Sequence, residues 1–141
     1  MVDEWIVAEF FFSLRKEADT EWVFIDGSYI RCHQHASGAR IGEHRAIGQS
    51  HGGRTTKIHL CCDADGYPLD FKVTGGEVHD SQVAPELIEL DSYLYKLRHL
   101  VENMFARLKQ FRSIATRYEK LARNFESMIY LACIIIHVKV N

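Results

Sequence analysis

The chain has 141 residues, of which 47% are hydrophobic and 26% are charged. This length suits one small domain, and the apolar content argues against a disordered protein. The net charge of −2 is divided into blocks, because residues 31–57 carry +4 and residues 96–123 carry +6 between acidic stretches. Basic blocks are what binding to a phosphate backbone requires, although a basic helix can also be merely solvated.

The cysteines and the apolar C-terminal segment indicate a chain without disulfides or a membrane anchor. None of the four cysteines (Cys32, Cys61, Cys62 and Cys133) forms a C-x-x-C pair, so we expect reduced, mostly buried residues of a cytosolic protein. The N-terminus is acidic and lacks the small-residue cleavage pattern of a signal peptide. The apolar run 128–138 is only about half a membrane span, which favours a core-packing or interface helix.

The first predicted elements are a short amphipathic helix at residues 4–16 and a strand at residues 21–32, which is rich in aromatic and β-branched residues. Alternation along the strand places Asp26 on one face with Trp22, Phe24, Ser28 and Ile30. A carboxylate in such a strand is unfavourable to bury unless it is paired or bound to a metal. The alternative is an edge-strand Asp that faces water or caps a turn with Gly27.

Residues 33–54 hold four histidines, five glycines and three arginines, with little apolar content. This composition predicts a flexible loop. His33 and His35 could be read as zinc ligands, but no partner set at ligand spacing follows them. A mobile basic loop that meets phosphates fits the composition better.

Residues 54–62 and 67–74 are predicted to form a hairpin, since the Asp65-Gly66 pair marks a turn between two strand-like runs. Asp63 and Asp65 are expected to serve that turn. A helix is predicted from about residue 82 to residue 90, with Asp80 or Ser81 as its N-cap.

Residues 95–109 are predicted to form a helix, because apolar residues recur at helical spacing without Gly or Pro. At roughly 100° per residue, four polar residues fall at about 0°, −60°, −20° and −40°, which makes one stripe beside the apolar face: Tyr95, Arg98, Glu102 and Lys109. An ordinary solvated face with an i,i+4 pair between Arg98 and Glu102 would look the same.

The order Tyr, two residues, Arg, three residues, Glu, six residues, Lys resembles the signature around the last acidic residue of DDE transposases of bacterial insertion sequences. Residues 95–109 match it at all four positions, and the continuation over residues 110–125 is also similar. The blocks around Asp26 and over residues 74–81 resemble the same family. The resemblance covers about residues 18–135, in two parts with a gap between them.

This resemblance implies an α/β, ribonuclease H-like fold, with Asp26 in the middle of the first strand and Glu102 on a late helix. The family's fourth strand, with its Asp-x-Gly-Tyr block, has no counterpart between residues 90 and 95. We therefore expect one incomplete domain over residues 1–141, with its central strands missing. It should hold a three-stranded antiparallel sheet within about residues 21–74 and basic C-terminal helices within about residues 94–138. The missing strands should leave an open sheet edge and exposed apolar surface.

The second catalytic Asp of the family lies in the missing segment. Asp91 is the only acid near the junction, although it lacks the following Gly and a strand to hold it. His79 and Asp80 are alternatives with no better support.

The resemblance also implies phosphoryl transfer with two Mg²⁺ or Mn²⁺ ions held by carboxylates. Asp26 and Glu102 are the expected catalytic and metal-binding residues. The expected DNA contacts are Tyr95, Arg98, Lys109, Arg112 and Arg117. Because the central Asp normally bridges both ions, we expect a transposase by descent with weak or no activity.

A second hypothesis is a non-enzymatic remnant in the bacterial cytoplasm. It would use a basic helix over residues 96–123 and an apolar helix over residues 124–138 to bind element ends, another copy of itself or a full-length transposase. Magnesium-dependent nicking separates the two hypotheses. A zinc-binding structural protein built on the histidines is a third, which stoichiometric zinc after purification would support.

Overall fold

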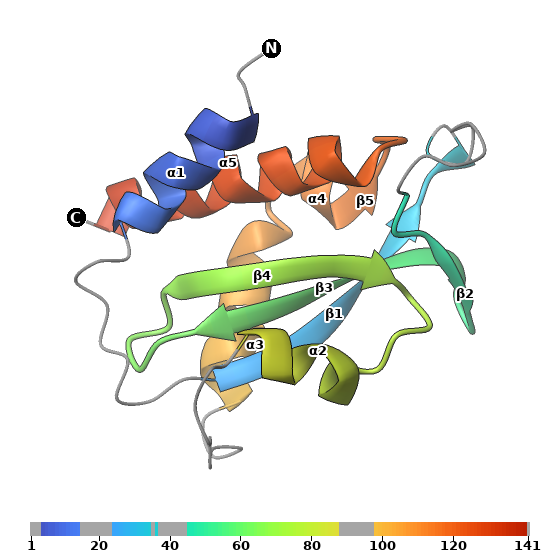
Figure 1. The fold of residues 1–141 in the computed structure, drawn as a ribbon, viewed down its shortest axis with the longest axis horizontal. Helices are drawn as coiled ribbons and strands as arrows, with labels where there is room; N and C mark the ends of the chain where they lie inside the picture. Colours follow the sequence, from blue (N-terminus) through green and yellow to red (C-terminus); the bar gives the residue numbers. More distant parts are fainter. Residues whose placement is uncertain (1–3, 15–23, 35, 37–44, 88–97, 141) are drawn as a thin grey trace.

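The structure is a computed structural model that describes residues 4–14, 24–34, 36, 45–87 and 98–140. These residues form an α/β arrangement, with a curled sheet and helices around it (Figure 1). The elements in chain order are α1 Glu4–Leu14, β1 Phe24–Cys32, β2 Gly48–Ser50, β3 Gly53–Cys62, β4 Pro68–Gly75, α2 Asp80–Leu87, α3 Arg98–Leu108, α4 Arg112–Ala115, β5 Thr116–Arg117 and α5 Ala122–Val140.

The centre of the sheet is the predicted antiparallel arrangement of three strands. β3 lies between β1 and β4, and Leu60 of β3 is opposite Asp26 on one side and Phe71 on the other. The turn between β3 and β4 is also as predicted, because Asp63 accepts hydrogen bonds from the backbone N–H groups of Asp65 and Tyr67. The Asp side chain thus satisfies two donors that the ladder leaves unpaired.

Two short strands correct the prediction. β2 pairs with the start of β3 through Ser50 and Gly53, inside the segment predicted to be a loop. Gly53 supplies the positive φ of 92° that this tight turn uses. β5 pairs in parallel with the end of β1, so the sheet has five strands among the described residues and is not purely antiparallel. Such short strands are set by their partners and have no periodic pattern of their own.

The helices divide between the two faces of the sheet. One face joins α1, α3 and α5 in a single apolar core, with β1, β3 and β4 contributing alternate residues. That core includes Phe24, Ile30, Ile58, Leu60, Phe71, Val73, Met104, Leu108, Phe125 and Ile129. α2 packs on the opposite face against β1, β3 and β4. Figure 1 shows α1 and α5 lying side by side.

The predicted helices are confirmed within the described residues, with two corrections. The basic segment 96–123 is not one helix, because α3 ends at Leu108 and α4 and β5 precede the start of α5. The second correction is at α2. This helix begins at Asp80, two residues before the predicted start. The ring of His79, rather than a side chain of Asp80 or Ser81, accepts a hydrogen bond from the N–H of Ser81 at 3.2 Å. The carboxylate of Asp80 instead contacts the ring of His59 through Oδ1.

The four cysteines are free, and all but the half-buried Cys32 are buried, as predicted. Burial raises the pKa of the Cys62 and Cys133 thiols well above the ordinary value, which keeps them protonated and unreactive. Among the described helices, none is both long and apolar enough to span a membrane.

Candidate active site

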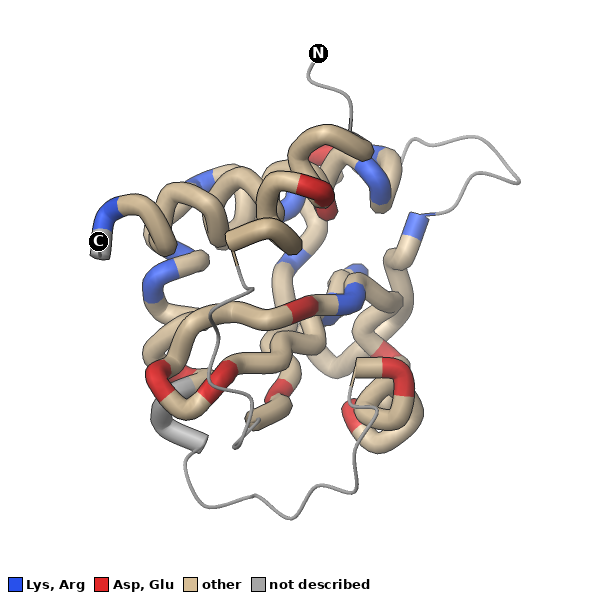
Figure 2. The backbone as a smooth tube through the Cα atoms, turned by 60° about the vertical axis from the view of Figure 1, so that its left-hand side comes forward, with Lys and Arg blue, Asp and Glu red and all other residues tan. Residues whose placement is uncertain are grey.

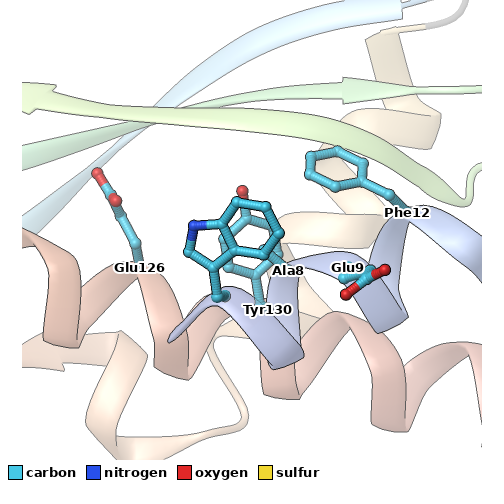
Figure 3. Close-up of a pocket in the computed structure, with 6 residues that line it drawn as sticks. Ala8, Glu9, Phe12, Glu126 and Tyr130 are labelled. Carbon is cyan, nitrogen blue, oxygen red and sulfur yellow. The ribbon is translucent and has the colours of Figure 1, made fainter. Parts of the chain in front are cut away.

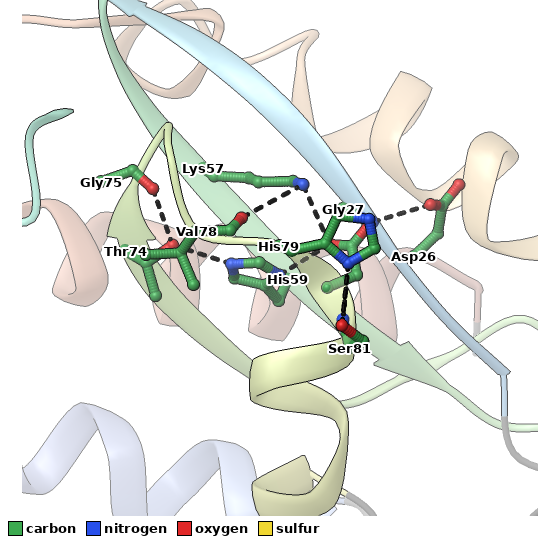
Figure 4. A network of polar contacts seen from close by, with 10 residues as sticks. Asp26, Gly27, Lys57, His59, Thr74, Gly75, Val78, His79 and Ser81 are labelled. Carbon is green, nitrogen blue, oxygen red and sulfur yellow. Dashed lines mark hydrogen bonds and ion pairs between the residues drawn. The ribbon is translucent and has the colours of Figure 1, made fainter. Parts of the chain in front are cut away.

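Asp26 is the third residue of β1, half-buried, on the face of the sheet that packs against α1, α3 and α5. Its neighbours on that face, Phe24 and Ile30, are buried in the core. One carboxylate oxygen of Asp26 accepts a hydrogen bond from the N–H of Gly27 at 2.9 Å (Figure 4). The carboxylate is thus held on the face of β1 that packs against α3.

Glu102 lies on α3, which packs against β1 and β3. Val101, Met104 and Leu108 face the core from this helix, and Glu102 is exposed beside them. Of the predicted stripe, Glu102 and Lys109 have described side chains, and both are exposed beside the apolar face. The contact between α3 and β1 brings the elements that carry Asp26 and Glu102 against each other.

The described residues do not complete a two-ion centre. Among them, no three His, Cys, Asp or Glu side chains are close enough to hold a metal ion together. Asp26 and Glu102 offer carboxylates of the kind that Mg²⁺ and Mn²⁺ prefer. They could serve at most one ion without a third acid. Asp91, the candidate for that role, lies outside the described residues.

Asp80 cannot take the role of the third acid beside Asp26, which corrects the alternative suggested by the sequence. Neighbouring residues of a strand point to opposite faces, and Gly27 faces α2. A Cβ atom added to Gly27 would come within 2.1 Å of Oδ1 of Asp80. Asp80 therefore lies behind the strand, on the face opposite the Asp26 side chain. His79, the other alternative, sits beside it at the start of α2.

The structure instead places Asp80 in a polar network that sequence reasoning missed. Figure 4 shows this network around Lys57, His59 and Thr74. Asp80 Oδ1 is 2.7 Å from Nδ1 of His59 and 3.3 Å from Nζ of Lys57. On the other side of the ring, Nε2 of His59 is 2.8 Å from Oγ1 of Thr74. Burial lowers the pKa of His59, and the hydrogen bond and charge of Asp80 partly oppose that shift. The neutral ring then donates from Nδ1 to the carboxylate, which can only accept.

A signal for this network was present in β3. Lys57 and His59 alternate with Ile58 and Leu60, which places the two polar side chains on the face away from the core. Both are nevertheless buried, because α2 covers that face. The sequence could have indicated the shared face, but not the helix that covers it.

Two of the predicted DNA contacts lie on the surface. Lys109 directly follows α3 and Arg112 begins α4, and both side chains are exposed. Arg98 is the first residue of α3, whereas Tyr95 lies outside the described residues. The helical layer carries most of the basic positions, and acidic ones gather at α2 and at the β3–β4 turn (Figure 2).

Arg117 is a correction, because it is fully buried (0% exposed) and cannot reach a DNA backbone in this structure. Its guanidinium donates hydrogen bonds to the backbone oxygens of Ala46, Glu119 and Lys120 and to Oγ1 of Thr56. Burial lowers the pKa of this guanidinium. Arg117 thus ties β3, β5 and the start of α5 together from inside.

Of the two histidines considered as zinc ligands, only His33 is among the described residues. The ring of His33 lies against that of Tyr118, with 4.7 Å between the ring centroids. His35 lies outside the described residues.

Comparison with known proteins gives one family. The family described as Transposase DDE domain matches the chain over residues 52–139, which include Glu102 but not Asp26. The chain is 28% identical over 129 residues to a Brucella ovis protein assigned as the transposase for insertion sequence element IS6501. That match covers 60% of this chain and 99% of the relative.

A second relative is similar over a short stretch. The chain is 59% identical over 27 residues to the uncharacterized protein y4sN of Sinorhizobium fredii, which covers 19% of this chain and 22% of that protein. No solved structure matches.

Proposed function

Because the chain belongs to the DDE transposases, whose domain matches residues 52–139, we propose that it is an insertion-sequence transposase by descent with an incomplete catalytic core. The core is a ribonuclease H-like domain that lacks its central strands. Its cleavage and transfer of DNA strands are weak or lost. The chain keeps a DNA-binding surface and part of the catalytic carboxylate set.

The observation that carries this proposal is the contact of α3 with β1. It sets the helix of Glu102 against the strand of Asp26, on the face where Asp26 points. Two carboxylates at such a contact suit one hard divalent ion, Mg²⁺ or Mn²⁺. Among the described residues this arrangement has no third acid for a two-ion centre, which is why full activity is not expected.

The length of the match to the Brucella ovis relative supports the loss of an internal segment from this chain. The alignment extends over 129 residues and takes up 99% of that protein, but only 60% of this chain. Part of the relative therefore has no counterpart here. In the sequence, only residues 88–97 separate the described part of α2 from the described part of α3.

The DNA surface in this proposal is the end of α3 and the start of α4. Lys109 and Arg112 contact the phosphate backbone, together with Arg98 and Tyr95 at the N-terminal end of the same segment. Phosphate contacts of this kind fix position and supply affinity without reading sequence. The DNA in question is the pair of element ends.

A non-enzymatic remnant is the second candidate, and the exposed face of α5 favours it. Leu131, Ile135 and Val138 are exposed large apolar residues at positions i, i+4 and i+7 of one helix. Such a stripe suits contact with another protein chain, such as a second copy or a full-length transposase.

A nicking assay distinguishes the two candidates. Supercoiled plasmid with the element's terminal repeats is incubated with the purified chain and Mn²⁺. Slow nicking that Asp26→Asn and Glu102→Gln both abolish supports a residual enzyme. Specific binding to the repeats without nicking, and unchanged in both variants, supports the remnant. Absence of both nicking and DNA binding contradicts the proposed function altogether.

A further inference from the structure

A pocket of about 460 Å³ opens between α1 and α5, on helices that contribute neither Asp26 nor Glu102. Its lining comes from both helices (Figure 3): Trp5, Ala8, Glu9, Phe12, Glu126 and Tyr130. Pockets of this size hold small molecules or single side chains of a partner. Nothing in the proposed transposase chemistry uses this pocket.

Aromatic rings form the walls of the pocket. Phe12 and Tyr130 meet nearly edge to face, with centroids 5.9 Å apart and an interplanar angle of 69°, so they make a corner. Tyr130 is held in place by Phe71, whose ring centroid lies 4.5 Å from its own. Trp5 is 79% exposed and stands at the mouth of the pocket. Because its indole is not part of the packed core, it can cover a ligand without disturbing that core.

Both ionisable carboxyl groups that line the pocket are acidic. Glu9 on α1 and Glu126 on α5 contribute two carboxylates, which lie on either side of Tyr130 in Figure 3. Of the described residues that line it, none is basic. A phosphate or another anion is therefore excluded by repulsion, whereas a cation gains from both carboxylates and from the aromatic faces.

We propose that this pocket binds the arginine side chain of a protein partner. A planar guanidinium can stack on an aromatic ring and donate paired hydrogen bonds to a carboxylate, which an ammonium cannot do in the same way. The pocket is open to solvent along one side, so it would leave much of a free small ion uncovered.

The test follows the indole N–H resonance of Trp5 in the intact 141-residue protein by ¹⁵N NMR. The probe is a capped pentapeptide with one arginine among glycines. Its neutral counterpart carries citrulline in place of arginine, and free arginine is the third ligand. Trp5→Phe identifies the resonance, since the chain has only one other tryptophan.

The arginine peptide is expected to shift the Trp5 resonance saturably, and the citrulline peptide is expected to leave it unchanged. Glu9→Gln combined with Glu126→Gln should weaken binding about tenfold or more. Asp65→Asn, which removes an exposed carboxylate at the β3–β4 turn, should not weaken it. Trp5→Ala, followed through neighbouring backbone resonances, should also weaken binding while leaving the folded spectrum intact.

Three results would overturn the proposal. One is the absence of a saturable shift with the arginine peptide. Another is equal binding of the citrulline peptide, which would remove the charge argument. The third is free arginine binding as tightly as the peptide, which would make the pocket a site for a small cation. None of these results depends on DNA binding or metal binding, so the proposed transposase function is tested separately.

Discussion

His59 and Asp80 lie 21 positions apart in sequence, and a contact of 2.7 Å joins Nδ1 of the ring to Oδ1 of the carboxylate behind the strand that carries Asp26. Asp80 is the first residue of α2, so this contact fixes the start of the helix to the centre of the sheet. Lys57 adds a charge to the same carboxylate. The backbone at Asp26 and Gly27 is thus supported from the face opposite the candidate site.

Gly27→Ala should destabilise the fold. An added Cβ would lie 2.1 Å from Oδ1 of Asp80 and 2.6 Å from Cε of Lys57, so both side chains must move. Overpacking of this kind lowers the free energy of unfolding by about 1–3 kcal/mol. Urea denaturation measures the change. Gly52→Ala is the matched control, because the nearest atom to its Cβ is 3.8 Å away; an equal loss in both variants would contradict the close packing at Gly27.

The stability of the chain should fall as the pH falls, in part through His59. Burial lowers the pKa of His59 in the folded state below its ordinary value of 6.5. Between the two pKa values the unfolded chain binds a proton that the folded chain does not, so stability rises with pH across that window. The loss should begin near pH 6.5 on acidification and end at the lower folded pKa.

His59→Gln removes this titration and should flatten the dependence. The measurement is the free energy of unfolding of both proteins at several pH values from about 7.5 to about 5. The wild type should lose more stability than the variant on acidification. Parallel curves for the two proteins would show that His59 is not held neutral in the folded state.

Replacement of Arg117 should lower the free energy of unfolding strongly, and replacement of Arg112 should hardly change it, although both residues belong to the basic C-terminal block. Arg117→Ala leaves the backbone oxygens of Ala46, Glu119 and Lys120 without the guanidinium donor. The loss should be about 3 kcal/mol or more in unfolding free energy. Arg112→Ala, at an exposed position, should change it by no more than about 0.5 kcal/mol. Thermal and urea unfolding check both values, and a stable Arg117→Ala protein would contradict the buried clamp.

Lys109→Ala and Arg112→Ala should each weaken DNA binding by a similar factor for all sequences. Each variant loses one phosphate contact, so the slope of log K against log salt should become shallower by about 1. Lys139→Ala is the control, because it removes an exposed charge in the last turn of α5. Fluorescence anisotropy at several salt concentrations measures the slopes. Equal effects of Lys139→Ala would indicate a general charge effect instead of a defined surface.

The elements with a strong local pattern were predictable from sequence. Alternation of Ile58 and Leu60 with polar residues, and the Asp65-Gly66 turn, determined the β3–β4 hairpin. The apolar spacing of Val101, Met104 and Leu108 determined α3 and the face that it buries. In each case the local period of the chain and the burial of one face agree.

The missed features depend on contacts between distant segments. β5 consists of two residues that form a strand only because they lie beside Arg31 and Cys32. The acceptors of Arg117 include Ala46 and Thr56, which are 71 and 61 positions away. No local sequence pattern predicts contacts between such distant residues. An arginine in a basic block looks like a surface residue until the fold supplies buried acceptors. The same reasoning applies to Asp80, which the sequence offered as a cap or a catalytic acid.

The central claim is that Asp26 and Glu102 form a carboxylate pair able to hold one divalent ion, and Mn²⁺ binding measured by electron paramagnetic resonance tests it most directly. The wild-type chain should bind Mn²⁺ weakly, Asp26→Asn and Glu102→Gln should each abolish that binding, and Asp65→Asn should retain it. Transposition should remain undetectable in every case. Binding that persists unchanged in Asp26→Asn or in Glu102→Gln would contradict the claim, and so would the absence of Mn²⁺ binding by the folded wild-type protein.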